Sequence, residues 1–216
     1  MKLKALAGMC KREGTFYLYD RVDPESGEVI EQWLGTAGAV YPLPALPYLT
    51  EDHLAALFDI TEKQRENVYF RHTQIPEWIN INHAAPDEIM LDREKMTLGY
   101  ENRIVRPLMT RDGLEFIDND FLTPIADVAD SLELYERHAD DGQVYFVAKV
   151  GFMVVAVFMP LSLIEEKFVE NMEELAEKCR TALKLKYERD AQRKAANAVQ
   201  MTLSEEEGRV EQEGQP

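Results

Sequence analysis

The residues of this chain that could do chemistry are concentrated in one acidic stretch. Residues 112–141 contain ten carboxylates and a single Lys or Arg, Arg137. The ten are Asp112, Glu115, Asp118, Asp120, Asp127, Asp130, Glu133, Glu136, Asp140 and Asp141. If the segment is helical, Asp127, Asp130 and Glu133 lie near one face. Such a group can mimic phosphate charge, bind a divalent metal ion or form an ordinary solvated face, and the sequence leaves the three interpretations open. The candidate acidic binding surface comprises Asp118, Asp120, Asp127, Asp130 and Glu133.

This stretch contains no local metal-binding motif. Asp118 and Asp120 resemble the start of an EF-hand loop, but the glycine at position 6 and the glutamate at position 12 are missing, which excludes calcium by that route. No two histidines form an HxH or HxxxH pair. We therefore predict no metal ligand and no cofactor. In the alternative of a metal-dependent enzyme, carboxylates of residues 112–141 combine with His72, His83 or His138 only after folding.

Nucleophile motifs are also absent from the sequence. It contains no GxSxG, Walker A or GxGxxG pattern. Neither cysteine belongs to a CxxC pair, so a cysteine zinc site is excluded. We expect Cys10 in a strand and Cys179 on an apolar helix face, both as reduced thiols packed in the core. No catalytic residue is assigned.

Two further segments could bind a partner. Residues 178–194 carry seven basic and two acidic groups, net +5. This segment could bind nucleic acid or an acidic protein, or it could be a solvated helix face; its candidate residues are Lys184, Lys186, Arg189, Arg193 and Lys194. The aromatic residues of the first third, together with Pro42, Pro44 and Pro47, either line a peptide groove or pack in the core.

The overall composition limits the possible partners. The chain has 24 Lys and Arg against 40 Asp and Glu, a formal charge of −16, and 45% hydrophobic residues. A core can therefore form, while the charge repels nucleic acid and anionic membranes and attracts a basic surface. The most apolar run, residues 150–160, is far shorter than the roughly 20 residues needed to span a bilayer. We expect a soluble, cytoplasmic protein without a signal peptide.

In the first half, alternating hydrophobicity predicts a β-meander over residues 3–43, beginning with a strand at residues 3–9. Thr50 and Thr61 are predicted helix N-caps, the second with Gln64 in a capping box. A strand is expected at residues 68–72. Residues 74–102 favour loop with short pieces of structure, and no internal repeat is recognised.

In the second half, the sequence predicts two hairpins and two helices. One hairpin joins 103–109 to 114–117. A helix is expected to begin at Thr123-Pro124, and residues 132–137 either extend it or begin a strand. The strands at 144–150 and 152–159 are apolar on both sides, which favours the middle of a sheet. An amphipathic helix follows over about residues 162–200, its first half packed on the sheet and its second half projecting. Residues 201–216 are expected to be a disordered acidic tail.

Several stretches carry a resemblance to a known group of proteins. They are LKALAGMCKR at 3–12, LYDR at 18–21, EQWLGTAGAVYPLPALPYL at 31–49, LELYER at 132–137, GFMVVAVFMP at 151–160 and FVENMEELAEKCR at 168–180. They resemble acidic proteins encoded by phages and mobile elements of gut Firmicutes. That group has no established activity, so the resemblance implies a genomic setting and supplies no catalytic residue.

Together these patterns predict a single α+β domain over residues 1–200, with mainly antiparallel strands, short helices and a long C-terminal amphipathic helix. The first functional hypothesis is a non-enzymatic acidic interaction protein of a phage or mobile element. It would bind a basic protein, for example to inhibit a host nucleic-acid-handling or defence complex. A metal-dependent enzyme and a helix-mediated oligomeric scaffold are the alternatives.

Overall fold

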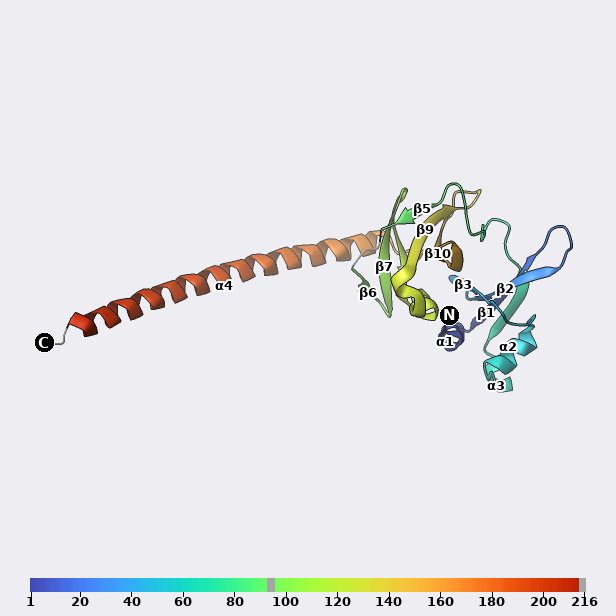
Figure 1. Ribbon diagram of the computed structural model, residues 1–216, viewed down its shortest axis with the longest axis horizontal. Coiled ribbons are helices and arrows are strands. Elements are labelled where there is room, and N and C mark those ends of the chain that lie inside the picture. The colour runs from blue at the N-terminus through green and yellow to red at the C-terminus, as the bar shows by residue number, and fades with distance from the viewer. Residues whose placement is uncertain (93–95, 214–216) are drawn as a thin grey trace. The chain divides into compact units, whose positions relative to one another are not determined.

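The computed structural model describes residues 1–92 and 96–213, with side chains described as far as residue 197. It contains mixed helices and strands, a mostly antiparallel sheet and a long C-terminal helix (Figure 1), as the sequence predicts. By its internal contacts the chain forms two units, residues 1–162 and 163–216, where the sequence predicts one domain over 1–200.

The first element is a helix, not the expected strand. Helix α1 spans Leu3–Glu13 and buries Leu6, Met9 and Cys10 on one side. Those three positions are three and four residues apart, which is the spacing of one helical face. The same segment also alternates in the way that favours a strand, so the sequence pattern fits both structures. The helix ends at Gly14, whose left-handed φ of 67° suits a residue without a side chain.

An eight-stranded sheet forms the centre of the first unit, in the order β4-β1-β2-β3-β11-β10-β9-β5. Its strands are β1 (Thr15–Val22), β2 (Val29–Gly35), β3 (Ala39–Pro42), β4 (Tyr69–Gln74), β5 (Ile89–Leu91), β9 (Leu132–His138), β10 (Val144–Val150) and β11 (Met153–Phe158). All neighbours are antiparallel except β1 and β4. The meander from residue 15 to 43 is confirmed, and so is the central position of β10 and β11.

Two short helices connect β3 to β4, which allows these strands to be distant in the sheet. Helix α2 (Glu51–Leu57) begins after Thr50, and α3 (Glu62–Arg65) begins after Thr61. Both N-caps form capping boxes, with His53 and Gln64 as the reciprocal partners. The predicted helix starts are confirmed.

A three-stranded sheet lies beside the large one, formed by β6 (Leu98–Tyr100), β7 (Arg103–Thr110) and β8 (Gly113–Asp118). The predicted hairpin of β7 and β8 is confirmed. Pro107 pairs with Phe116 of β8 and lies beyond the three residues of β7 that pair with β6. Its missing N–H is therefore tolerated, because that side of β7 is an edge there.

The acidic helix differs from the prediction. It is a 3-10 helix, η1 (Asn119–Ser131), capped by Asp118, and Pro124 lies inside it rather than at its first turn. The chain kinks at Ile125 and Val128, then enters β9 at Leu132. Glu133 therefore belongs to a strand, and the expected helical face of Asp127, Asp130 and Glu133 does not form.

The large sheet has an approximate internal two-fold arrangement. The order helix-strand-strand-strand occurs twice, as α1-β1-β2-β3 and as η1-β9-β10-β11, with β3 paired to β11 at the centre. The two helices are in contact, and the N–H of Lys2 donates to the carbonyl of Pro124 at 2.7 Å. Helices and the small sheet bury one face of the large sheet, while Ile75, Ile79 and Ile81 pack on the other face.

The second unit is dominated by helix α4 (Glu166–Glu213). Its predicted existence is confirmed, and it extends into the segment where we expect a disordered tail. Phe168 is buried, whereas Leu175 and Leu183 are about half exposed, at 50% and 49%. Cys179 is also exposed, so its expected core position is wrong. The packing of this helix on the sheet stays a prediction. Within the described residues, no helix combines the length and apolar character needed to cross a bilayer.

Candidate functional site

The structure disperses the five carboxylates of the candidate acidic surface. Asp118 is buried, caps η1 and pairs with Arg103, so it is a structural residue and not part of a surface. Asp120 pairs with Arg12, and Asp127 pairs with the N-terminal ammonium group, both at 2.8 Å. That ammonium group, through a hydrogen bond that outweighs the small effect of burial, lowers the pKa of Asp127.

Two carboxylates of the candidate acidic surface remain accessible to a partner. Asp130, at the end of η1, and Glu133, at the start of β9, are exposed, and no ion pair joins either to a cation in the described part of the chain. Glu133 accepts a hydrogen bond from the Tyr135 hydroxyl. These two side chains are therefore exposed carboxylates without an ion pair among the described residues, although Glu133 lies opposite Lys149 on β10.

An apolar pocket of about 290 Å³ lies between β7, η1 and β9. Its lining includes Leu108, Leu122, Ile125, Ala129 and Leu132, and also the polar side chains of Arg106 and Asn119, which are hydrogen-bonded to each other. Asp130 directly follows the lining residue Ala129. Glu133 follows Leu132 within β9, and because successive side chains of a strand point to opposite faces, its carboxylate lies on the other face from Leu132 and Leu134. The arrangement combines a mainly apolar cavity with one unpaired carboxylate, Asp130, next to its lining in the chain, as in the centre and rim of a protein interface.

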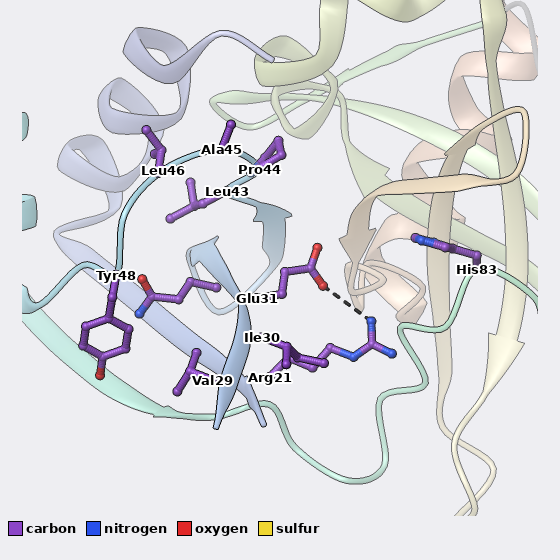
Figure 2. A pocket seen from close by; sticks show the side chains of 11 residues that line it. Arg21, Val29, Ile30, Glu31, Leu43, Pro44, Ala45, Leu46, Tyr48 and His83 are labelled. Carbon is purple, nitrogen blue, oxygen red and sulfur yellow. Dashed lines mark ion pairs between the residues drawn. The ribbon is translucent and has the colours of Figure 1, made fainter. Parts of the chain in front are cut away.

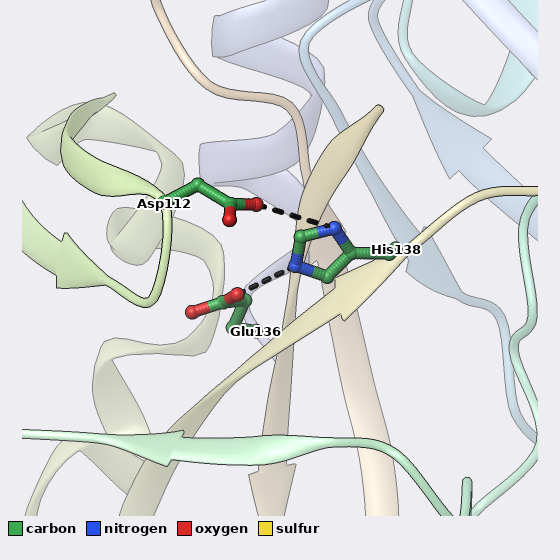
Figure 3. Close-up of side chains that lie close together, drawn as sticks. All are labelled: Asp112, Glu136 and His138. Atoms are coloured by element: carbon green, nitrogen blue, oxygen red, sulfur yellow. Dashed lines mark hydrogen bonds and ion pairs between the residues drawn. The ribbon is translucent and has the colours of Figure 1, made fainter. Parts of the chain in front are cut away.

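A second site is formed by one histidine and two carboxylates. Asp112 lies in the turn between β7 and β8, while Glu136 and His138 lie two apart on β9 and so point to the same side (Figure 3). One ligand atom from each of the three lies within 4.8 Å of the others. Sequence analysis names all three as candidates for a folded metal site but does not single them out, because a turn and a strand far apart in the chain bring them together.

The other histidines named for a metal site lie elsewhere. His72 on β4 contacts Asp20 on β1, with 2.9 Å between Nε2 and Oδ2. These two strands are at the opposite end of the large sheet from β9. His83 Nδ1 accepts the backbone N–H of Val154 at 3.3 Å. Each of these two imidazoles therefore has a structural hydrogen bond, and neither contacts the carboxylates of residues 112–141.

A larger cavity of about 420 Å³ lies beside the β1–β2 hairpin and the proline-rich loop (Figure 2). Pro44, Tyr48 and His83 are among its lining residues, and Arg21 pairs with Glu31 inside it at 3.6 Å. By contrast, Trp33, Tyr41 and Phe58 are buried. The predicted aromatic group is thus divided between the core and the surface, because Tyr48, Tyr69 and Trp78 are exposed, and Tyr48 contributes to a surface cavity.

The basic segment lies on α4. Lys184, Lys186, Arg189, Arg193 and Lys194 are all exposed. Among the described residues none of the five has an ion-pair partner, whereas Lys178 and Arg180 pair with Glu174 and Glu177. Lys186, Arg189 and Arg193 share one helical face at spacings of three and four. The segment is therefore accessible to an anionic ligand.

Sequence analysis missed one buried ionic cluster, formed by Glu88, Arg137 and Lys149. Glu88 accepts two hydrogen bonds from Arg137, at 3.0 and 2.5 Å, and a third from Lys149. The side chains of Arg137 and Lys149 are 1% and 5% exposed. Their positions on the adjacent strands β9 and β10 are readable from the hairpin pattern, but Glu88 comes from the loop that the sequence leaves undefined.

The two cysteines should differ sharply in reactivity. Cys10 is fully buried, and burial, reinforced by Glu13, raises the pKa of its thiol to about 12. Cys179 is exposed on α4. We expect a thiol reagent such as DTNB at pH 8 to label one thiol quickly in the folded protein and the second only after denaturation. A Cys179→Ala variant should lose the fast phase; a fast phase that persists in this variant would contradict the buried position of Cys10.

Fold and site together define an α+β protein with a mostly antiparallel sheet, a net negative charge and a cluster of potential metal ligands. Comparison with family descriptions, with curated proteins and with solved structures finds no match for this chain. Functional conclusions therefore rest on its own residues.

Proposed function

We propose that this chain is a non-catalytic interaction protein of a phage or mobile element, and that it binds a basic protein partner. The observation that supports the proposal most directly is the mainly apolar pocket between β7, η1 and β9, whose lining residue Ala129 is followed by the exposed, unpaired Asp130. An apolar side chain of a partner would fill the pocket, while a neighbouring Lys or Arg side chain would pair with Asp130.

The charge of the whole chain supports the same partner class. A formal charge of −16 accelerates encounter with a positively charged surface and slows encounter with nucleic acid or another acidic protein. Proteins that handle nucleic acids present basic surfaces to phosphates. We therefore propose a nucleic-acid-handling or defence protein of the host as the partner, inhibited by occupation of that surface.

A double variant tests the docking surface. Asp130→Asn/Glu133→Gln removes the two unpaired carboxylates of the candidate acidic surface, of which Asp130 neighbours the pocket, and we expect the association rate constant with the captured partner to fall by about tenfold at low salt. The partner is first captured from host lysate with the full chain, washed across a salt series and identified by mass spectrometry. The rate constant is then measured with the purified pair.

The matched control is Glu25→Gln/Glu28→Gln, which removes the same charge from the exposed turn between β1 and β2. It should slow association much less than Asp130→Asn/Glu133→Gln does, because it changes the net charge equally but away from the pocket. Equal losses in both double variants would mean that only net charge matters and would remove the pocket from the proposal. Failure to capture any basic protein that is released as salt rises would overturn the proposed function itself.

One observation favours a second candidate, the metal-dependent enzyme. Among the residues named for it, Asp112, Glu136 and His138 converge. That convergence supports metal binding, whereas a reaction also requires a substrate group that reaches the metal.

A further inference from the structure

The cluster of Asp112, Glu136 and His138 has a defined hydrogen-bond direction. Glu136 is fully buried, and its Oε2 accepts the backbone N–H of Arg111 at 3.0 Å. Its Oε1 lies 2.5 Å from His138 Nε2 and 3.4 Å from the side-chain Nε of Arg111. An ionised carboxylate can only accept hydrogen bonds. The proton of a neutral His138 therefore resides on Nε2.

That tautomer leaves an unpaired acceptor on the other ring nitrogen. With Nε2 protonated, His138 Nδ1 carries a lone pair. Nδ1 faces Asp112 Oδ2 at 3.6 Å, and this carboxylate oxygen is an acceptor as well. Two acceptors that face each other attract a cation between them, either a proton on Nδ1 or a metal ion.

The separation of these two atoms suits a shared metal ion. Bonds of about 2.0–2.2 Å from zinc to nitrogen and oxygen, at a tetrahedral angle, place the two ligand atoms about 3.4 Å apart. The observed 3.6 Å is close to that value and is longer than a good N–H···O hydrogen bond. The side chain of Asp112 is 63% exposed, so an ion and its water ligands can reach the site.

The surrounding charges assign different roles to the two carboxylates. Arg111 directs its guanidinium and its backbone N–H to Glu136, which compensates the charge of that buried group. Asp112 has only the His138 ring as a partner among the described contacts. Glu136 therefore orients the imidazole, as carboxylates behind metal-bound histidines commonly do, and Asp112 is the anionic ligand.

We propose that Asp112 and His138 bind one divalent transition-metal ion of the zinc class, with Glu136 as the positioning carboxylate. One imidazole and one carboxylate favour zinc or a similar ion over calcium and magnesium, which prefer oxygen ligands alone. Two protein ligands leave the other coordination positions to solvent, so the site is open. This inference is independent of the proposed docking function.

Zinc binding to the full-length protein tests the proposal by isothermal titration calorimetry. We expect one Zn²⁺ per chain in the wild type and at least a tenfold weaker affinity in Asp112→Asn. The matched control is Asp140→Asn, an exposed carboxylate two residues after His138, which should bind like the wild type. Equal affinities in the wild type and in Asp112→Asn would overturn the site.

A second readout separates metal from proton. In long-range ¹H–¹⁵N spectra of the imidazoles at pH 7, added Zn²⁺ should shift the Nδ1 resonance of His138 while Nε2 keeps its proton. If both nitrogens carry protons with and without zinc, the cation between His138 and Asp112 is a proton and the metal site is refuted. Glu136→Gln should weaken zinc binding about 10–100-fold while Asp112 and His138 are intact. Full zinc affinity in this variant would remove the positioning role of Glu136.

Discussion

Replacement of Glu88 by glutamine is expected to lower the free energy of unfolding by about 3–5 kcal/mol, because it leaves two buried cations without a counter-charge. Arg137 is 1% exposed and Lys149 is 5% exposed, and Glu88 is the carboxylate that both contact. Chemical denaturation of the purified protein at pH 7 measures the change. Asp87→Asn, at the exposed neighbouring position, is the control and should change stability by less than about 0.5 kcal/mol.

The free energy of unfolding at acidic pH provides an independent test of the role of Glu88. Burial raises the pKa of Glu88, but the hydrogen bonds and positive charges of Lys149 and Arg137 outweigh it, so the net pKa is lowered. The contribution of a group with a lowered pKa is complete above its value in the unfolded chain and is lost as pH falls through the folded value. Wild-type protein should therefore lose more stability below pH 5 than Glu88→Gln does.

A compensating variant distinguishes an uncompensated charge from lost packing. If the penalty in Glu88→Gln comes from buried positive charge, adding Lys149→Met should recover part of the lost stability. Strictly additive losses in the double variant would show that the cost lies in packing. An unchanged midpoint in Glu88→Gln would mean that solvent reaches the cluster freely.

Substitution of Gly35 by alanine is expected to destabilise the fold by about 3 kcal/mol or more, because the added carbon has no space. A Cβ at this position would lie 1.9 Å from the carbonyl oxygen of Ala39 and 2.7 Å from the Cα of Val40. The neighbouring backbone cannot move away easily, because Gly35 pairs with both Val40 and Tyr17 across β3 and β1. Its carbonyl also accepts a hydrogen bond from the Cys10 thiol.

Gly8→Ala is the matched control for that substitution. Gly8 lies on the exposed side of α1, and nothing lies within 4 Å of a Cβ added there. Alanine should raise stability by about 0.5–1 kcal/mol, because it favours helix more than glycine does. Thermal unfolding of both variants gives the comparison; similar shifts of the same sign would contradict the close approach of β2 and β3.

The accuracy of the sequence predictions varied with the range of the interactions involved. Thr50 and Thr61 were recognised as N-caps because the cap partner is three residues away. The pairing of β10 with β9 and β11 follows from turns a few residues long. By contrast, α1 was predicted as a strand, since a short run of small apolar residues satisfies both periods and only its packing against η1 and the sheet decides between them.

The candidate sites depended on distant contacts even more strongly. Asp118 belonged to the predicted acidic surface, but Arg103 and the start of η1 bury it. Glu133 would share a face with Asp130 only if the helix continued through residues 132–137, but the chain turns into β9 between them. Composition predicts how much negative charge the surface carries, whereas the fold determines which carboxylates remain unpaired.

The sequence by itself determined the α+β class, the hairpins, the capped helices, the long C-terminal helix and the excess of negative charge. These features depend on composition and on neighbours within a few positions. Only the tertiary structure decided the pairing of β3 with β11 and of β1 with β4. It also decided the convergence of Asp112 with Glu136 and His138, and of Glu88 with Arg137 and Lys149. These contacts join segments separated by long stretches of chain, and they form because the sheet buries its two apolar faces, a condition that no local pattern specifies.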